Sequence, residues 1–215
     1  MPPISAALAP SAPSLKDRKA ALVRAQLAHR AISLILERGF DAVTIDDLAA
    51  AAGISRRSFF RYFPTKEDVV IRGFEEGGAA LLDELGRRTE SEPPLLALRS
   101  TLDAVIATFG TDPTRGGAVL DLVRRTSTLR ARFLLVQDDW TQRVAAVLRA
   151  RMKARGRDAD MRAHLIARVV VATIDSALVT WSVRRGEPLR AIAAEAFEAL
   201  SAVVRETAVT QSAVK

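Results

Sequence analysis

The amino-acid sequence predicts an all-α protein. Alanine, leucine, valine and arginine dominate its 215 residues, and aromatic residues make up only 5% of them. Apolar residues recur at the three- and four-residue spacing of amphipathic helices, and no stretch alternates with the two-residue period of a half-buried strand. A chain of this length can hold one large domain or two modest ones, each with an ample core.

The N-terminal part is expected to begin with a long helix over residues 15–38. Its apolar stripe consists of Val23, Leu27, Ala31 and Leu34. Gly39 is expected to end this helix, with Phe40 packing back against it. Residues 1–14 contain four prolines and no basic start followed by an apolar core. We therefore expect a disordered arm there and no signal peptide.

The segment from Thr44 to Lys66 has the pattern of a helix-turn-helix. Thr44 can cap a first short helix, and Gly53 suits the left-handed turn after it. Ser55 can cap a second short helix that runs to about Tyr62, with arginines in its exposed first turn, as in helices that read the DNA major groove. The alternative is an ordinary helical hairpin with a solvated arginine face, but the combination of features favours DNA binding.

A linking helix is expected over residues 65–88, in which Gly77 and Gly78 mark a bend or a close helix crossing. A second helical bundle is expected over residues 89–208. Its helices are expected from Pro94 to Phe109, from Pro113 to Thr126, from a cap at Thr128 to Lys153, from Asp160 to Arg185 and from Pro188 to Thr207. Residues 209–215 are expected to fray.

Charge and composition narrow the class of function. The formal net charge is +7 with a pI near 10.6, which favours polyanions, although an arginine-rich source composition explains the same charge. Cysteine is absent, which removes disulfides and thiol catalysis and fits a reducing cytoplasm. The apolar run over residues 165–183 approaches membrane length. Arg168 and Asp175 interrupt this run, so a buried helix is expected and no membrane span.

Two runs of sequence resemble the TetR family of transcriptional regulators, also called TetR/AcrR. They are RGFDAVTIDDLAA at residues 38–50 and AGISRRSFFRYFPTKED at residues 52–68. The resemblance implies an N-terminal three-helix helix-turn-helix DNA-binding domain over residues 15–64. It also implies a C-terminal helical bundle for ligand binding and dimerisation. The last two long helices would hold a homodimer together, and the alternative is a fully buried helix inside a monomer.

The same resemblance assigns roles within the motif. Arg56, Arg57 and Ser58 would read base edges, because arginine suits a bidentate contact with guanine. Tyr62 and Lys66 would contact phosphates at helix ends, together with Thr44. The complete set of expected DNA-binding residues is Thr44, Ser55, Arg56, Arg57, Ser58, Arg61, Tyr62 and Lys66.

Phe60 departs from the pattern of the family. Many relatives carry a tyrosine at this position, whose hydroxyl meets a phosphate. Phe60 cannot form that hydrogen bond, so affinity must come from elsewhere, such as Arg61 or the basic start of the first helix. That start contains Lys16, Arg18 and Lys19, which could touch the DNA backbone or minor groove, or could equally form a solvated helix start.

The C-terminal half is loosely similar to the branch of the family with acyl-CoA-like ligand domains. The expected lining of an effector site is Phe109, Arg124, Phe133, Gln137, Trp140, Asp175 and Trp181. Both tryptophans are more often core residues than ligand contacts. Asp175 could anchor a polar group of the ligand, but pairing with an arginine such as Arg124 or Arg125 is preferred, because an unpaired buried carboxylate is costly. The basic run over residues 149–157 could hold phosphates, but a solvated helix end favoured by the helix dipole is preferred.

An enzyme and an architectural DNA-binding protein are the competing classes. His29 and His164 lie near no carboxylate cluster or nucleophile motif, and neither a phosphate loop nor a metal-ligand set is present. We therefore expect no catalytic site, no metal and no cofactor. DNA packaging alone needs no large second bundle. The sequence thus predicts a cytoplasmic, ligand-responsive repressor that binds a palindromic operator as a homodimer and is released by a small, largely apolar effector.

Overall fold

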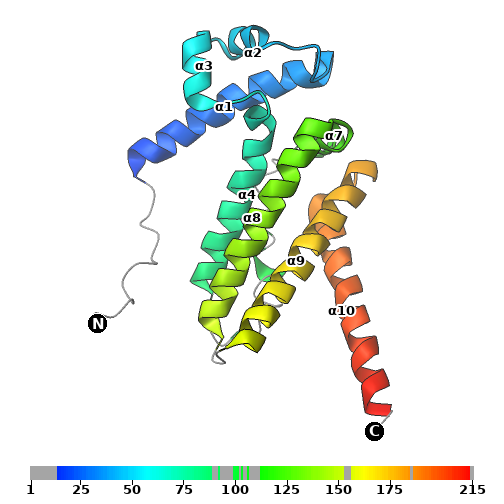
Figure 1. Cartoon of the computed structure of the whole chain (residues 1–215). Helices are drawn as coiled ribbons and strands as arrows, with labels where there is room; N and C mark the ends of the chain where they lie inside the picture. The colour runs from blue at the N-terminus through cyan, green and yellow to red at the C-terminus, as the bar shows by residue number, and fades with distance from the viewer. Residues whose placement is uncertain are drawn as a thin grey trace, which may run out of the picture. The chain divides into compact units, whose positions relative to one another are not determined.

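The structure, a computed structural model, describes residues 14–88, 92, 99–101, 103, 106, 112–152, 156–184 and 186–213. These parts of the chain contain eight helices and no strand, as the sequence predicts for an all-α protein (Figure 1). The chain divides into two compact units, residues 1–69 and residues 70–215, so that the boundary falls at the start of the helix α4. The expected arm lies outside the described residues, except for Ser14.

The first unit contains α1 (Leu15–Arg38), α2 (Ile45–Ala52) and α3 (Arg56–Tyr62). Its core is formed by apolar side chains from all three helices and the turns between them. Among the most deeply buried are Ala31, Ile35, Val43, Leu48, Phe59 and Phe63. Gly39 ends α1 with φ 91°, and its N–H donates to the carbonyl of Ile35 at 2.8 Å. Phe40 is buried behind it, as expected for a chain that packs back on the helix.

The apolar stripe of α1 differs in part from the expected one. Leu27 and Ala31 are buried, but the third fully buried position is Ile35, four residues further on. Val23 and Leu34 are only half-buried. The inward face therefore follows a strict four-residue spacing, which a count of apolar residues alone does not distinguish from neighbouring stripes.

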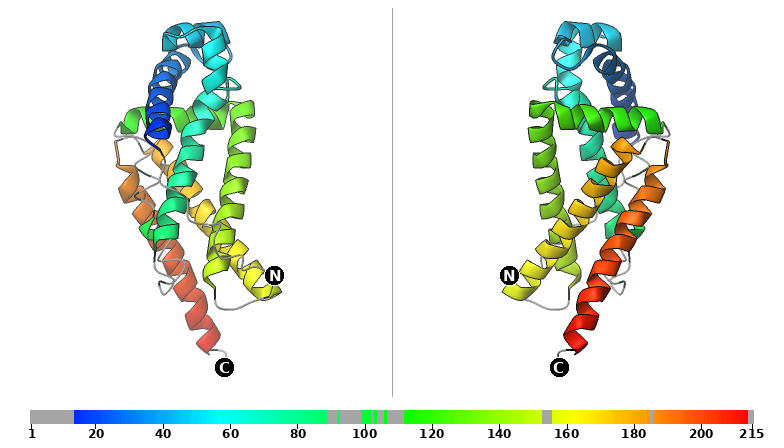
Figure 2. Two further views of the ribbon diagram at one scale, coloured as in Figure 1. Left: turned by 90° about the vertical axis from the view of Figure 1, so that its left-hand side faces the viewer. Right: turned by 90° about the vertical axis from the view of Figure 1, so that its right-hand side faces the viewer.

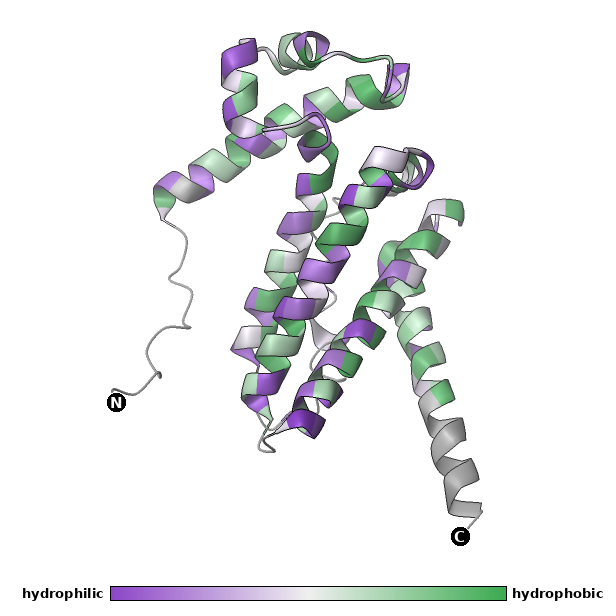
Figure 3. Cartoon of the chain, viewed as in Figure 1, coloured by the Kyte–Doolittle hydropathy of each residue, from purple (hydrophilic) through white to green (hydrophobic). Residues whose placement is uncertain are grey.

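The second unit contains α4 (Asp68–Arg87, of which residues 70–87 belong to it), α7 (Pro113–Arg125), α8 (Ser127–Arg151), α9 (Arg157–Val183) and α10 (Leu189–Ala213). α9 packs against α7, α8 and α10. Figure 2 shows α7 running across the direction of α8. Hydrophobic and hydrophilic residues alternate along α4, α8 and α9 (Figure 3), which is the pattern of helices that bury one side.

Several helix ends differ from the expected ones. α4 is assigned from Asp68 and not from Thr65, although Thr65 caps it: the N–H of Asp68 donates to Thr65 Oγ1 at 3.2 Å. The predicted cap at Thr128 is wrong, because α8 already begins at Ser127, directly after Thr126, which ends α7. α9 begins at residue 157 and not at 160, because Gly156, with φ 100°, turns the chain immediately before it.

The end of the chain is also more regular than expected. α10 continues to Ala213, so that residues 209–213 are helical. No glycine or proline follows Pro188 to interrupt it. The start of α7 agrees with expectation, since Asp112 Oδ1 accepts from the N–H groups of Thr114 and Arg115 at 3.0 and 3.1 Å. The expected helix from 94 to 109 lies mostly outside the described residues.

α9 is the one described helix that is long and apolar enough to cross a membrane by length and composition. Such a helix is weak evidence for a span, because core helices of soluble bundles pass the same test. Ten of its side chains are buried in the bundle, among them Val170, Ile174, Leu178 and Trp181. These contacts bury one side of α9, so the expectation of a buried helix holds for that side only.

Candidate functional site

The helix α2 is held at both ends by local hydrogen bonds. The N–H of Asp47 donates to Thr44 Oγ1 at 3.2 Å, and the N–H of Thr44 donates to Asp47 Oδ2 at 2.9 Å, which together form a capping box. The hydrogen bonds from Thr44 lower the pKa of Asp47 from its ordinary value, so its carboxylate stays ionised at neutral pH. At the other end Gly53 adopts φ 74°, and its N–H donates to the carbonyls of Ala49 and Ala50.

The helix α3 is oriented by its own cap and by two aromatic anchors. The N–H of Ser58 donates to Ser55 Oγ at 3.2 Å, which confirms the expected cap. Phe59 and Phe63 are fully buried, with ring centroids 5.3 Å apart. Because these two side chains fix the inner face, the outer face carries the three exposed arginines Arg56, Arg57 and Arg61.

Arg56 and Arg57 differ in their surroundings. The guanidinium of Arg56 forms an ion pair with Asp46 at 2.7 Å and lies 5.7 Å from the ring centroid of Phe60. Phe60, which departs from the family pattern, is 41% exposed and so offers Arg56 this ring face. Arg57 has no hydrogen bond or ion pair with any described residue. Arg57 is therefore available to a ligand at once, whereas Arg56 must first leave Asp46.

The other expected contacts lie in the same unit. Arg61 lies over the ring of Tyr62 at 5.1 Å, and Lys66 Nζ lies 4.4 Å from the ring centroid of Phe40. The hydroxyl of Thr44 donates to Asp47 at 2.5 Å, so this group already has a partner. The structure thus brings the eight expected residues into one unit of the chain, and their contacts with DNA remain a prediction.

The variant Asp46→Asn is expected to raise the affinity for DNA of any sequence by about two- to fivefold per protomer. An exposed ion pair is worth ~0.2–1 kcal/mol, and its loss releases Arg56 while a carboxylate near phosphates is removed. Fluorescence anisotropy at low salt measures the change. Glu37→Gln is the control, because it makes the same charge change at an exposed residue of α1. An equal gain in both variants would show that net charge alone matters.

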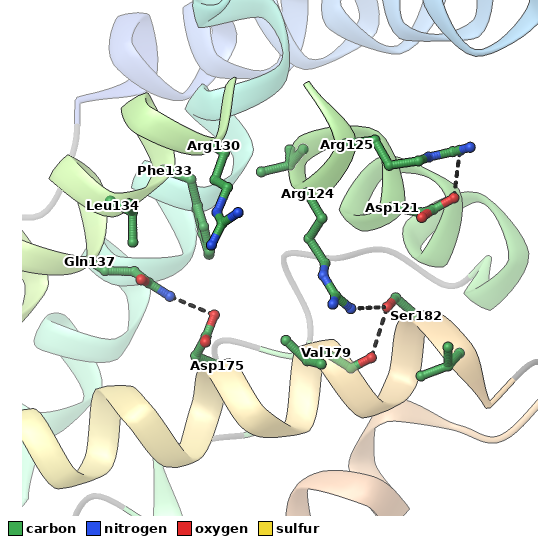
Figure 4. A pocket seen from close by; sticks show the side chains of 12 residues that line it. Asp121, Arg124, Arg125, Arg130, Phe133, Leu134, Gln137, Asp175, Val179 and Ser182 are labelled. Carbon is green, nitrogen blue, oxygen red and sulfur yellow. Dashed lines mark hydrogen bonds and ion pairs between the residues drawn. The ribbon is translucent and has the colours of Figure 1, made fainter. Parts of the chain in front are cut away.

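The second unit contains a cavity between α7, α8 and α9 (Figure 4). Its volume is about 500 Å³, within the usual range for a drug-sized ligand. Four of the seven residues expected at an effector site line it: Arg124, Phe133, Gln137 and Asp175. Residues that are far apart in the sequence thus line one cavity, from three different helices. Phe109 lies outside the described residues.

The two tryptophans lie in the core and are not among the residues that line this cavity. Trp140 is 3% exposed and packs where a Cβ on Gly78 would overlap its indole ring. Trp181 is 5% exposed and stands in the same relation to Gly116, while its indole N–H donates to the carbonyl of Glu187 at 3.0 Å. The expected close helix crossing at Gly78 is therefore confirmed.

The expected partner of Asp175 is wrong. Asp175 Oδ1 accepts a hydrogen bond from Gln137 Nε2 at 2.7 Å. Arg124 donates instead to the hydroxyl of Ser182 at 3.3 Å, and Arg125 pairs with Asp121 at 2.5 Å. Ser182 is seven residues, or roughly 10 Å along the helix, beyond Asp175, so Arg124 reaches a different part of α9.

Reasoning from sequence missed Arg130, Val179 and Ser182, which line the cavity together with Leu134. One pattern could have found Arg130. Arg130, Phe133, Leu134 and Gln137 follow the spacing i, i+3, i+4 and i+7 and therefore share one face of α8. The positions on α9 depend on how the helices pack, which the sequence does not state.

The basic run after α8 is used within the bundle where the structure describes it. Arg149 pairs with Asp160, and Arg151 donates to the carbonyl of Leu85 at 2.9 Å. Residues 153–155 lie outside the described residues. These two arginines therefore connect α8 to its neighbours. Neither of the two expected roles, a phosphate site or a solvated helix end, includes such contacts.

The two histidines lie on different helices, α1 and α9. His29 is exposed on α1, and His164 Nε2 accepts from Arg168 at 3.2 Å. Among the residues that the structure describes, no group of three or more histidine or acidic side chains could hold a metal ion.

Comparison with known proteins places the motif in a family. Residues 27–72 match the family of bacterial regulatory proteins of the tetR type. The chain is 31% identical over 195 residues to the HTH-type transcriptional regulator TcmR of Streptomyces glaucescens, a match that covers 88% of this chain and 85% of TcmR. It is 25% identical to the HTH-type transcriptional repressor DhaR of Mycobacterium sp. strain GP1, over 83% of this chain and 92% of DhaR.

Solved structures of regulators share the fold. A transcriptional regulator from Aquifex aeolicus matches with a TM-score of 0.57 at 14% identity, over 84% of this chain and 99% of that one. FadR from Bacillus subtilis, in complex with stearoyl-CoA, matches with a TM-score of 0.54 at 19% identity, over 81% of this chain and 95% of that one. Together with the capped α2 and α3, the similarity to TcmR over most of both chains shows that the chain belongs to the TetR family of helix-turn-helix transcriptional regulators.

Proposed function

We propose that this regulator is a repressor that binds a palindromic operator as a homodimer and leaves it when a small effector enters the cavity between α7, α8 and α9. The observation that carries the proposal is the geometry of α3. This helix is capped by Ser55, anchored by Phe59 and presents Arg57 without a partner among the described residues.

The DNA contacts follow from that geometry. The exposed first turn of α3 enters the major groove, where Arg57 forms a bidentate contact with guanine and Arg56 follows after release from Asp46. Two such helices in a symmetric dimer meet successive major grooves about 34 Å apart, which is why a palindrome is expected. Lys66 and Arg61 contact phosphates, and these contacts set affinity and register but not sequence preference.

Exposed apolar side chains on α9 and α10 support a homodimer. Leu165, Val183 and Val203 are 60%, 71% and 60% exposed. Leu165 and Val183 are eighteen residues apart on α9, which is five helical turns, so they share one side of this helix. A second copy with the same surface would cover that side by symmetry. The alternative is a monomer, which sedimentation of the purified protein distinguishes.

The effector is proposed to be small, with a largely apolar body. The cavity places Phe133, Leu134 and Val179 beside polar groups, which is the usual composition of a ligand site. Acyl-CoA-like molecules form one class to test. An effector releases DNA only if it binds the DNA-free conformation more tightly than the DNA-bound one.

Selection of genomic fragments by the purified protein, with binding titrated against salt, tests the proposal. Enrichment of one or a few palindromes with a steep salt dependence supports a specific regulator. Strong binding without enrichment indicates an architectural protein instead. A candidate effector then has to lower the affinity for the selected operator in a saturable way.

Lys66→Ala is expected to weaken binding to all DNA sequences alike and to reduce the slope of log K against log salt by about one per protomer. The reason is that a phosphate contact releases counterions but reads no base. Anisotropy titrations on the selected operator and on a scrambled duplex at several salt concentrations measure both quantities. Because Lys66 also lies over Phe40, the melting temperature of the variant serves as the control for folding. An unchanged salt slope would remove Lys66 from the DNA contacts.

A further inference from the structure

The cavity between α7, α8 and α9 carries unbalanced positive charge. Three arginines and two aspartates line it: Arg124, Arg125, Arg130, Asp121 and Asp175. Arg125 is neutralised by Asp121 at 2.5 Å, and Asp175 is occupied by the amide of Gln137 at 2.7 Å. Two guanidinium groups are left without a carboxylate partner among the described residues.

These two guanidinium groups belong to Arg124 and Arg130. Arg124 donates only to the neutral hydroxyl of Ser182, at 3.3 Å, and Arg130 has no hydrogen bond or ion pair with any described residue. In Figure 4 both side chains reach toward α9 from different helices, Arg124 from α7 and Arg130 from α8. Their unused N–H groups are therefore donors that face one space from two sides.

Along α8, the lining of the cavity changes from charged to apolar to polar. On α8 the same face carries Arg130, then Phe133 and Leu134, then Gln137 with its partner Asp175. Phe133 is 8% exposed and Leu134 is 55% exposed, so the apolar part of the lining includes surface that solvent can reach. A ligand along this face meets a cation at one end, an apolar middle and a hydrogen-bonded amide and carboxylate at the other.

We propose that the effector is an amphipathic acid whose ionised group binds between Arg124 and Arg130 while its apolar body covers Phe133 and Leu134. The inference rests on the proposed function of this cavity as the effector site. A neutral apolar ligand would offer no charged acceptor to these two exposed guanidinium groups, whereas an anion forms charge-assisted hydrogen bonds with them. A cationic ligand would meet two arginines and a single carboxylate without an ion pair among the described residues, that of Asp175.

A matched pair of fluorescent probes tests the charge. 8-Anilinonaphthalene-1-sulfonate is anionic, and N-phenyl-1-naphthylamine has the same ring skeleton without the sulfonate. Arg124→Gln and Arg130→Gln are each expected to weaken binding of the sulfonate about fivefold, the size of a partly screened charge-assisted hydrogen bond. The double variant is expected to lose at least tenfold, with affinity for the neutral probe changed less than twofold.

Two further variants locate the effect. Arg162→Gln removes an exposed arginine of α9 that does not line the cavity and is expected to leave both probes unaffected. Asp175→Asn removes a negative charge from the lining and is expected to strengthen binding of the sulfonate. Equal losses of both probes in the double variant would show collapse of the cavity and overturn the inference. Unchanged sulfonate binding in that variant would overturn it as well.

The outcome is independent of the test of the proposed function. Operator binding is measured by anisotropy without any probe, for the wild type and for the double variant. If both proteins bind the operator but the sulfonate is not preferred over the neutral probe, the proposed repressor is supported and the acidic effector is rejected. If the sulfonate is preferred over the neutral probe but no operator is selected, the anion site is supported and the proposed repressor is rejected.

Discussion

Arg57→Ala is expected to weaken binding to the operator by about 30-fold for each half-site, which corresponds to about 2 kcal/mol, and to relax the preference for one base pair in that half-site. Arg57 is exposed at the start of a capped helix and has no hydrogen bond or ion pair to any described residue. Its guanidinium therefore loses no interaction within the described protein when it binds a base. Competition between the selected operator and variants changed at single base pairs measures the relaxed preference.

Arg57→Lys separates base reading from charge. Lysine keeps the positive charge but cannot form the fork of two parallel hydrogen bonds, so this variant is expected to bind scrambled DNA normally and the operator poorly. The control for net charge is Arg162→Ala, which removes an exposed arginine of the other unit. If Arg57→Lys discriminates between operator and scrambled duplex as well as the wild type does, Arg57 contacts only phosphates.

The motif could be predicted from sequence because its determinants are local. Thr44 caps α2, Gly53 ends it and Ser55 caps α3, and each acts on backbone groups within a few residues. The ion pair of Arg56 with Asp46 joins residues ten positions apart on two helices. That contact depends on the crossing of α2 and α3, so it could be recognised only in the structure.

At the cavity, too, the contacts between helices could not be predicted from the sequence. Arg124, Phe133, Gln137 and Asp175 were expected at an effector site, but the partner of Asp175 was wrong. The pairing of Gln137 with Asp175 depends on the register between α8 and α9, which pack against each other. Hydropathy patterns set which face of a helix is buried, and they do not set which residue meets which across a crossing.

Gly78→Ala is expected to lower the free energy of unfolding by about 2 kcal/mol, or the melting temperature by about 4–8 °C. A Cβ at this position would overlap the indole ring of Trp140, which is 3% exposed. Gly73→Ala is the matched control on the same helix, since a Cβ there would meet nothing within 4 Å. Because alanine favours a helix over glycine, Gly73→Ala is expected to stabilise the protein by up to ~1 kcal/mol.

Opposite signs for two identical substitutions on one helix would locate the close contact at Gly78, and both melts are compared at one protein concentration because dimerisation shifts stability. A gain in stability in Gly78→Ala would mean that Trp140 is not held against α4.

The substitution at Gly78 is also expected to affect the cavity, because the ring of Phe133 lies 6.5 Å from that of Trp140 and 4.8 Å from that of Phe74 on α4. Displacement of Trp140 shifts the side chain that forms the apolar middle of the cavity. Gly78→Ala should therefore weaken binding of the anionic and the neutral probe alike, in contrast to the arginine variants, which affect only the anion.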